Sequence, residues 1–107
     1  MTFNVKVTLT VGLTTKDGQQ LDEDYVVQGV IAPVLHGIGQ DGFSVTENVG
    51  YWKGQPEKSL TVTVFGNANE LLHSDVLHAA HMIATACKQE CVLWSRESCA
   101  AGLEYAK

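Results

Sequence analysis

The chain has 107 residues, of which 45% are hydrophobic and 18% charged, and its formal net charge is -5. This length and composition predict one domain, residues 1–107, with a single core, and exclude the charge-rich regime of disordered chains. The seven cationic residues are scattered along the sequence, so we expect no nucleic-acid partner.

The N-terminal segment predicts a long strand. Six apolar residues between Phe3 and Leu13 alternate without interruption with polar or small residues, which is the period of an amphipathic β-strand. The residues Thr15-Lys16-Asp17-Gly18 that follow are typical of a turn.

The next segment predicts a helix. Three acidic residues, 22–24, suit a helix N-terminus, and apolar residues from Val27 to Ile38 recur at spacings of three and four. Pro33 removes one backbone hydrogen bond, so we expect a kink or a split near Val30. Glycines 37, 39 and 42 then end the helix and turn the chain.

Two further strands follow as a hairpin. Apolar and polar residues alternate over 43–52 and again over 59–64, and residues 53–57 form the connection. Tyr51 and Trp52 point to opposite faces of their strand, so we expect one of them in the core and the other on the open face or rim.

A second helix and a last strand complete the pattern. Asn67 or Asn69 is the expected N-cap, and an apolar stripe runs from Leu72 to Cys87. Residues 91–94 read as a fourth strand, residues 99–102 as a turn and residues 103–105 as a short fifth strand. The order strand, helix, strand, strand, helix, strand predicts a ferredoxin-like βαββαβ α+β fold, with an antiparallel sheet and two helices on one face.

The sheet face turned away from the helices is the first candidate surface. If Val5, Val7, Leu9, Val45, Val62 and Val64 face the helices, the other face carries Thr8, Thr10, Thr46, Asn48, Thr61 and Thr63. Such a face is either solvated or covered by another molecule. Its lack of charge suits an interface, so we expect a homodimer formed through this open face.

The histidines and cysteines do not predict a metal site. His78 and His81 are one turn apart but fall on the solvent side of their helix. Cys87 and Cys91 occupy positions that the core pattern wants apolar, and Cys99 completes no zinc-knuckle spacing. We therefore expect no metal and no cofactor.

Cysteine usage and hydropathy bear on the compartment. Three cysteines cannot all pair within one chain, and no apolar run approaches the roughly 18 residues of a membrane span. No basic region followed by an apolar block opens the sequence. We expect a soluble, cytoplasmic protein with reduced thiols and no membrane contact.

The segment 50–59 is the most unusual stretch. Two adjacent aromatic residues, two lysines and Glu57 surround a tight connection. Amphipathic aromatics at a rim often mark binding surfaces, although ordinary hairpin packing would also account for them. Glu57 is within reach of pairing with Lys53, but an exposed pair contributes little to stability.

Several segments resemble a family of small, uncharacterised bacterial and phage proteins with a ferredoxin-like domain. They are Gly18, Ile31-Ala32-Pro33, Gly42-Phe43-Ser44-Val45-Thr46, Gly50-Tyr51-Trp52-Lys53, Glu57-Lys58-Ser59 and Gln89-Glu90-Cys91-Val92-Leu93. Members often begin with a secretion or lipoprotein signal and have a longer connection between the tryptophan and the glutamate. The resemblance implies a fold rather than an activity. If the family shares a site, it implies ligand- or partner-binding residues at Trp52, Lys53, Glu57, Gln89 and Glu90.

Two functions fit these features of the sequence. The favoured hypothesis is a small non-catalytic binding or regulatory protein, phage-encoded and acting on a host protein partner. The alternative is a small enzyme with a sheet-lined pocket for an organic ligand, in which Glu47, Glu57 or His36 supplies acid–base chemistry. We assign no catalytic residue from the sequence. A cavity that contains Trp52 and a partly buried carboxylate would favour the enzyme.

Overall fold

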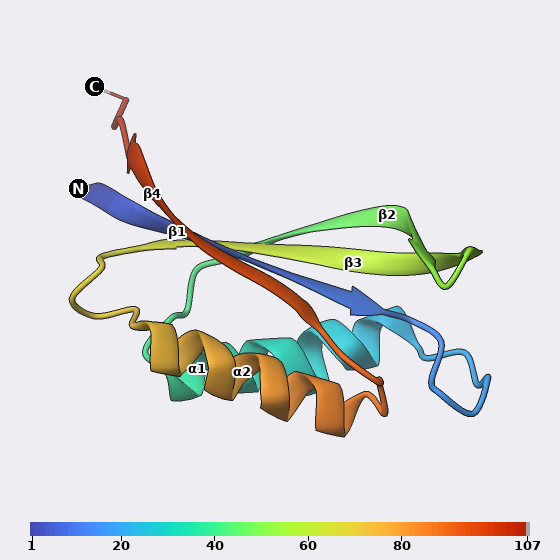
Figure 1. The fold of residues 1–107 in the computed structure, drawn as a ribbon. Coiled ribbons are helices and arrows are strands. Elements are labelled where there is room, and N and C mark those ends of the chain that lie inside the picture. The colour runs from blue at the N-terminus through green and yellow to red at the C-terminus, as the bar shows by residue number, and fades with distance from the viewer. Residues whose placement is uncertain (107) are drawn as a thin grey trace.

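The computed structural model describes residues 1–106 and contains one antiparallel sheet with helices on a single face (Figure 1). The spatial order of the strands is β2-β3-β1-β4. The strands are β1 (Thr2–Gly12), β2 (Ser44–Trp52), β3 (Gln55–Gly66) and β4 (Leu93–Gly102); the helical elements are η1 (Tyr25–Ile31), α1 (Ala32–Gly37) and α2 (His73–Ala86). The chain therefore has the ferredoxin-like α+β fold that the sequence predicts.

The core lies between the sheet and the helices. The alternating residues of β1 and β3 that face the helices are buried to 2% exposure or less, and Val45 packs against them. Burying each such side chain contributes roughly 1.5–3 kcal/mol. The threonines on the opposite face, among them Thr8 and Thr61, stay partly accessible. The predicted assignment of faces is thus correct.

The first helix changes geometry just before its proline. Residues Tyr25–Ile31 form π-helical turns, in which the Ala32 N–H donates to the Val27 carbonyl five residues earlier. From Ala32 the helix continues as α-helix, with Pro33 as the second residue of that α-helical part. The expected interruption therefore takes the form of a switch in helix type.

The start of α2 differs from the prediction. The helix begins at His73, and neither Asn67 nor Asn69 caps it; the Leu72 N–H donates instead to Asp75 Oδ2 at 2.9 Å. The buried residue before the helix is Leu71, whereas Leu72 is 45% exposed. The rest of the predicted stripe, through Val76 and Ile83 to Cys87, is buried as expected.

The C-terminal prediction is wrong. Residues 99–102, predicted as a turn, belong to β4, and residues 103–105 form no fifth strand. Strand β4 pairs with β1 from Thr10↔Leu93 to Thr2↔Gly102, with a register shift between Phe3 and Val5. Backbone pairing with β1 holds these residues, which lack an apolar alternation that would reveal the strand.

Among residues 1–106, no helix has the length and apolar character to span a bilayer.

Candidate functional site

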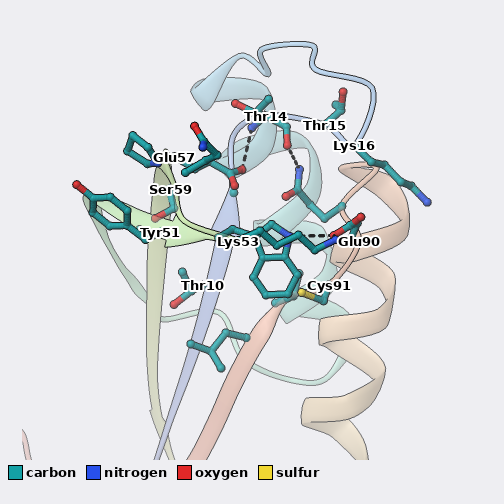
Figure 2. A pocket seen from close by; sticks show the side chains of 18 of the residues that line it. Thr10, Thr14, Thr15, Lys16, Tyr51, Lys53, Glu57, Ser59, Glu90 and Cys91 are labelled. Carbon is teal, nitrogen blue, oxygen red and sulfur yellow. Dashed lines mark hydrogen bonds and ion pairs between the residues drawn. The ribbon is translucent and has the colours of Figure 1, made fainter.

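The tip of the β2–β3 hairpin and the α2–β4 connection lie at the end of the sheet remote from the chain termini (Figure 1). These segments line a cleft of about 1010 Å³ (Figure 2). Its floor includes Thr10 and Ser59 from the open face, and its walls are the β2–β3 hairpin and the connection between α2 and β4. All five predicted site residues line it: Trp52, Lys53, Glu57, Gln89 and Glu90. The structure brings them together around one cavity from segments far apart in the sequence.

The hairpin tip is tighter than the sequence indicates. Trp52 pairs with Gln55 across a two-residue turn, Lys53-Gly54, and both turn residues have positive φ, 51° and 78°. This is the geometry of a type I′ turn, which matches the twist of the flanking strands. The predicted connection of 53–57 is therefore wrong at its C-terminal end, and Glu57 is part of β3.

Glu57 lies on the cleft floor because position 12 has no side chain. A Cβ on Gly12 would lie 2.8 Å from Glu57 Cδ and closer still to its Oε1, far inside van der Waals contact. The Thr14 N–H donates to the same oxygen at 3.4 Å (Figure 2). The residue is half-buried and has no ion-pair partner within residues 1–106. Glu57 does not pair with Lys53, although the sequence places the two within reach; Lys53 pairs with Glu90 instead.

Gln89 connects the α2–β4 connection to the segment that follows β1. Its Nε2 donates to the carbonyls of Thr14 at 3.0 Å and Cys87 at 3.1 Å. Its Oε1 would lie 2.7 Å from a Cβ on Gly12, so the same glycine makes room for it. Gln89 thus fixes the α2–β4 connection against the end of β1, beside Glu57.

Trp52, Lys53 and Glu90 form a second polar group at the cleft mouth. Trp52 Nε1 donates to Glu90 Oε2 at 2.9 Å, and Lys53 Nζ lies 3.5 Å from the same oxygen. The Trp52 hydrogen bond and then the positive charge of Lys53 hold the pKa of Glu90 below its usual value. Glu90 is therefore a stable anion at neutral pH.

Neither aromatic residue of the hairpin is in the core. Tyr51 is 75% exposed and Trp52 is 49% exposed, because the end of the hairpin extends beyond the helices (Figure 1). The expectation that one of the pair is buried is therefore wrong.

Sequence reasoning also missed Gly12 and Thr14 as residues of the cleft. The one signal in the sequence was that Gly12 occupies a polar-face position at the end of the first strand.

The other acid–base candidates lie outside the cleft. Glu47 pairs with Lys58 at 2.8 Å, which lowers the pKa of Glu47, and both side chains are exposed. His36 Nδ1 lies 2.6 Å from Asp41 Oδ1, and this contact raises the pKa of His36. Of the three candidates named from the sequence, only Glu57 faces the cavity.

The histidines and cysteines that the sequence singled out differ in burial. His78 and His81 are exposed, as predicted, and within residues 1–106 no three His, Cys, Asp or Glu side chains are arranged to hold a metal ion. Cys87 is buried, and this burial raises its pKa. Cys91 is exposed and lines the cleft, so its predicted role in the core is wrong.

Comparisons with known proteins identify structural neighbours only. No protein-family model matches the chain, and no curated protein matches it. A phage SAM lyase in its apo state superposes with a TM-score of 0.75 at 19% identity, covering 98% of this chain and 94% of that one. A phage SAM lyase in complex with S-methyl-5'-thioadenosine gives 0.63 at 18% identity over 97% and 93%.

A further neighbour is a nitrogen regulatory PII-like protein, CPII, from Thiomonas intermedia K12, bound to ADP, AMP and bicarbonate. Its TM-score is 0.59 at 7% identity, over 98% of this chain and all of that chain. At these identities the likeness establishes the fold alone. The resemblance to an uncharacterised family stays a prediction.

Proposed function

We propose that this protein binds S-adenosylmethionine in the cleft and cleaves it, releasing S-methyl-5'-thioadenosine. The observation that carries the proposal is the half-buried Glu57 carboxylate, held against Gly12 with no cationic partner among residues 1–106. An uncompensated carboxylate on a cavity floor attracts a positively charged ligand. Two structural neighbours are phage SAM lyase structures, one of them in complex with S-methyl-5'-thioadenosine, which supports this choice of ligand.

The composition of the cleft fits this ligand. Its volume of about 1010 Å³ is at the upper end of small-molecule sites, roughly 300–1,000 Å³. The exposed Tyr51 ring, which also lines the cleft, offers a flat surface for a nucleoside base, and Lys16 suits a carboxylate. The adenine, the ammonium and the carboxylate of S-adenosylmethionine thus have counterparts in Tyr51, Glu57 and Lys16.

The charges favour a cation over a phosphate. Two carboxylates and two lysines line the cleft, and Lys53 is already paired with Glu90. The unpaired Glu57 would repel a phosphate group. A nucleotide such as the ADP or AMP in the PII-like neighbour is therefore a poorer fit than an adenosyl cation.

The proposed cleavage balances without an oxidant or a second substrate. The bond between the sulfonium sulfur and Cγ of the amino-acid group breaks, and its electron pair stays on sulfur in the neutral thioether product. Cγ gains a bond from the substrate's own carboxylate, giving a lactone, or Cβ loses a proton and an alkene forms. Glu57 accepts a hydrogen bond from the substrate ammonium in the first route and accepts the proton in the second.

Product analysis tests this proposal. Purified protein incubated with S-adenosylmethionine should release S-methyl-5'-thioadenosine, detected by chromatography and mass spectrometry, and NMR of the second product separates lactone from alkene. The Glu57→Gln variant should lose about a hundredfold in rate. Glu47→Gln, which removes an exposed carboxylate outside the cleft, is the matched control and should keep full activity.

A non-catalytic binding role is the second candidate, and one observation favours it. Val49 and Tyr51, at the end of the hairpin, are 65% and 75% exposed. Exposed apolar side chains on a projecting hairpin suit contact with a macromolecule. A protein that neither binds nor cleaves S-adenosylmethionine, but loses a partner in the Tyr51→Ser variant, would have this function instead.

The homodimer remains a prediction of the open face. Leu93, at 71% exposure, and Phe65, at 40%, lie on that face beside the partly accessible threonines. If a second copy of the chain covered Leu93 and Phe65, their apolar surface would be removed from water. Light scattering across micromolar concentrations tests it, and a monomer throughout would contradict it.

A further inference from the structure

Three side chains meet where the tip of the β2–β3 hairpin faces the α2–β4 connection. Glu90 Oε2 accepts the hydrogen bond from Trp52 Nε1 and lies 3.5 Å from Lys53 Nζ. The same ammonium lies 5.7 Å from the centre of the Trp52 ring. An aromatic ring and a carboxylate therefore share one cation at the mouth of the cleft.

The residue that supplies this cation has a backbone conformation poorly suited to it. Lys53 has a φ of 51°, in the left-handed region that glycine, asparagine and aspartate adopt most readily. The first position of a type I′ turn is usually one of those residues. What lysine contributes at this position is an ammonium group that lies beside the Glu90 carboxylate and over the Trp52 ring.

The contacts of that ammonium are open to exchange. The Lys53 side chain is 71% exposed and that of Glu90 is 47% exposed. Exposed ion pairs and exposed cation–π contacts are each weak. A ligand cation that is oriented by further contacts in the cleft can therefore replace Lys53 at this position.

We infer that the Trp52 ring and the Glu90 carboxylate form the subsite for the sulfonium group of S-adenosylmethionine, and that Lys53 fills this subsite in the free protein. The inference rests on the proposed function. A sulfonium has no N–H donor, so an aromatic face and a nearby negative charge suit it, whereas an ammonium needs an acceptor such as Glu57. The Lys53 ammonium therefore competes with the sulfonium of the ligand for this subsite.

Binding measurements on matched ligands test the subsite. S-Adenosylhomocysteine has the same adenosine and amino-acid groups but a neutral thioether, so it reports all contacts except that of the sulfonium. In a Glu57→Gln background, which should slow turnover about a hundredfold, Lys53→Met should lower the dissociation constant of S-adenosylmethionine about fivefold and change that of S-adenosylhomocysteine less than twofold. Glu90→Gln should weaken S-adenosylmethionine selectively.

The control is Lys58→Met. Lys58 is also exposed and also paired, with Glu47, but it does not line the cleft. This variant should leave both affinities unchanged. Weaker binding of S-adenosylmethionine by Lys53→Met would overturn the inference, because Lys53 would then contact the ligand's carboxylate. Equal changes for both ligands would also overturn it.

A second probe separates this inference from the proposed function. Trimethylsulfonium, a sulfonium without an adenosyl group, should shift the Trp52 indole N–H resonance in ¹⁵N NMR spectra, with assignment by Trp52→Phe. The shift should saturate at about fivefold lower concentration in Lys53→Met. A trimethylsulfonium shift in a protein that does not bind S-adenosylmethionine would contradict the proposed function but support the subsite. No shift in either protein would overturn the subsite.

Discussion

The carboxyl group of Glu57 lies against the backbone of Gly12, in space that any larger residue at position 12 would fill. Strands β1 and β3 are adjacent in the sheet, and Gly12 pairs with Ser59. The end of β1 therefore determines where a carboxylate on β3 is held. The floor of the cleft depends on this close approach.

Gly12→Ala should displace Glu57 and empty the cleft floor of its charge. We expect a loss of stability of about 1 to 3 kcal/mol from the steric conflict and loss of most ligand binding and turnover. Denaturant unfolding and product release measure the two effects. Gly42→Ala is the control, because a Cβ there meets nothing within 4 Å. Full activity in Gly12→Ala would show that the position of Glu57 does not matter.

Trp52→Phe should raise the pKa of Glu90 toward its ordinary value, since the Trp52 hydrogen bond is the largest cause of its lowering. NMR titration of the Glu90 side chain measures this directly. In the native protein the lowered pKa means that Glu90 stabilises the fold above the ordinary glutamate pKa of about 4.3, and this contribution is lost as pH falls through the lowered value. An unchanged Glu90 titration would contradict the observed hydrogen bond.

His36 should show the opposite pH dependence. Its contact with Asp41 raises its pKa, so it stabilises the fold below the ordinary histidine pKa of about 6.5 and loses that contribution as pH rises through the raised value. Asp41→Asn should return the His36 titration to its ordinary range by NMR. Because this pair lies outside the cleft, ligand affinity should stay as in the unmodified protein; a changed affinity would place His36 in the site after all.

The three cysteines should differ in reactivity toward a thiol reagent. Cys87 is buried and its pKa is raised, so it should react only on unfolding, whereas Cys91 is exposed and should react first. Cys99 is partly exposed and should be intermediate. S-Methyl-5'-thioadenosine in the cleft should protect Cys91, which lines it, and leave Cys99 unaffected. Mass spectrometry of peptides measures the modification of each cysteine. Equal protection of Cys91 and Cys99 would argue against binding in the cleft.

The elements that bury alternating or periodic apolar residues could be predicted from the sequence. Strand β1, the β2–β3 hairpin and the core stripe of α2 follow such patterns, and from them come the fold and the open face. Strand β4 could not be predicted in full, because Ser95, Arg96 and Glu97 show no apolar alternation and are held by backbone pairing with β1. The start of α2 was missed because Asp75 caps it from inside the helix.

The lining of the candidate cleft could be predicted only in part. The resemblance pointed to Trp52, Lys53, Glu57, Gln89 and Glu90, and the fold places all five around one cavity. Their pairing could not be predicted, because it depends on a two-residue turn that directs Lys53 to Glu90 and not to Glu57. The need for a glycine at position 12 arises from a contact between two strands. The alternation of apolar and polar residues within either strand does not indicate this contact.

The release of S-methyl-5'-thioadenosine from S-adenosylmethionine, compared between the unmodified protein and the Glu57→Gln variant, tests the central claim most directly. We predict steady product formation by the unmodified protein, a rate about a hundredfold lower in Glu57→Gln, and an unchanged rate in Glu47→Gln. No product from the unmodified, folded protein, or equal rates in all three proteins, would contradict the assignment of this cleft as a site of S-adenosylmethionine cleavage.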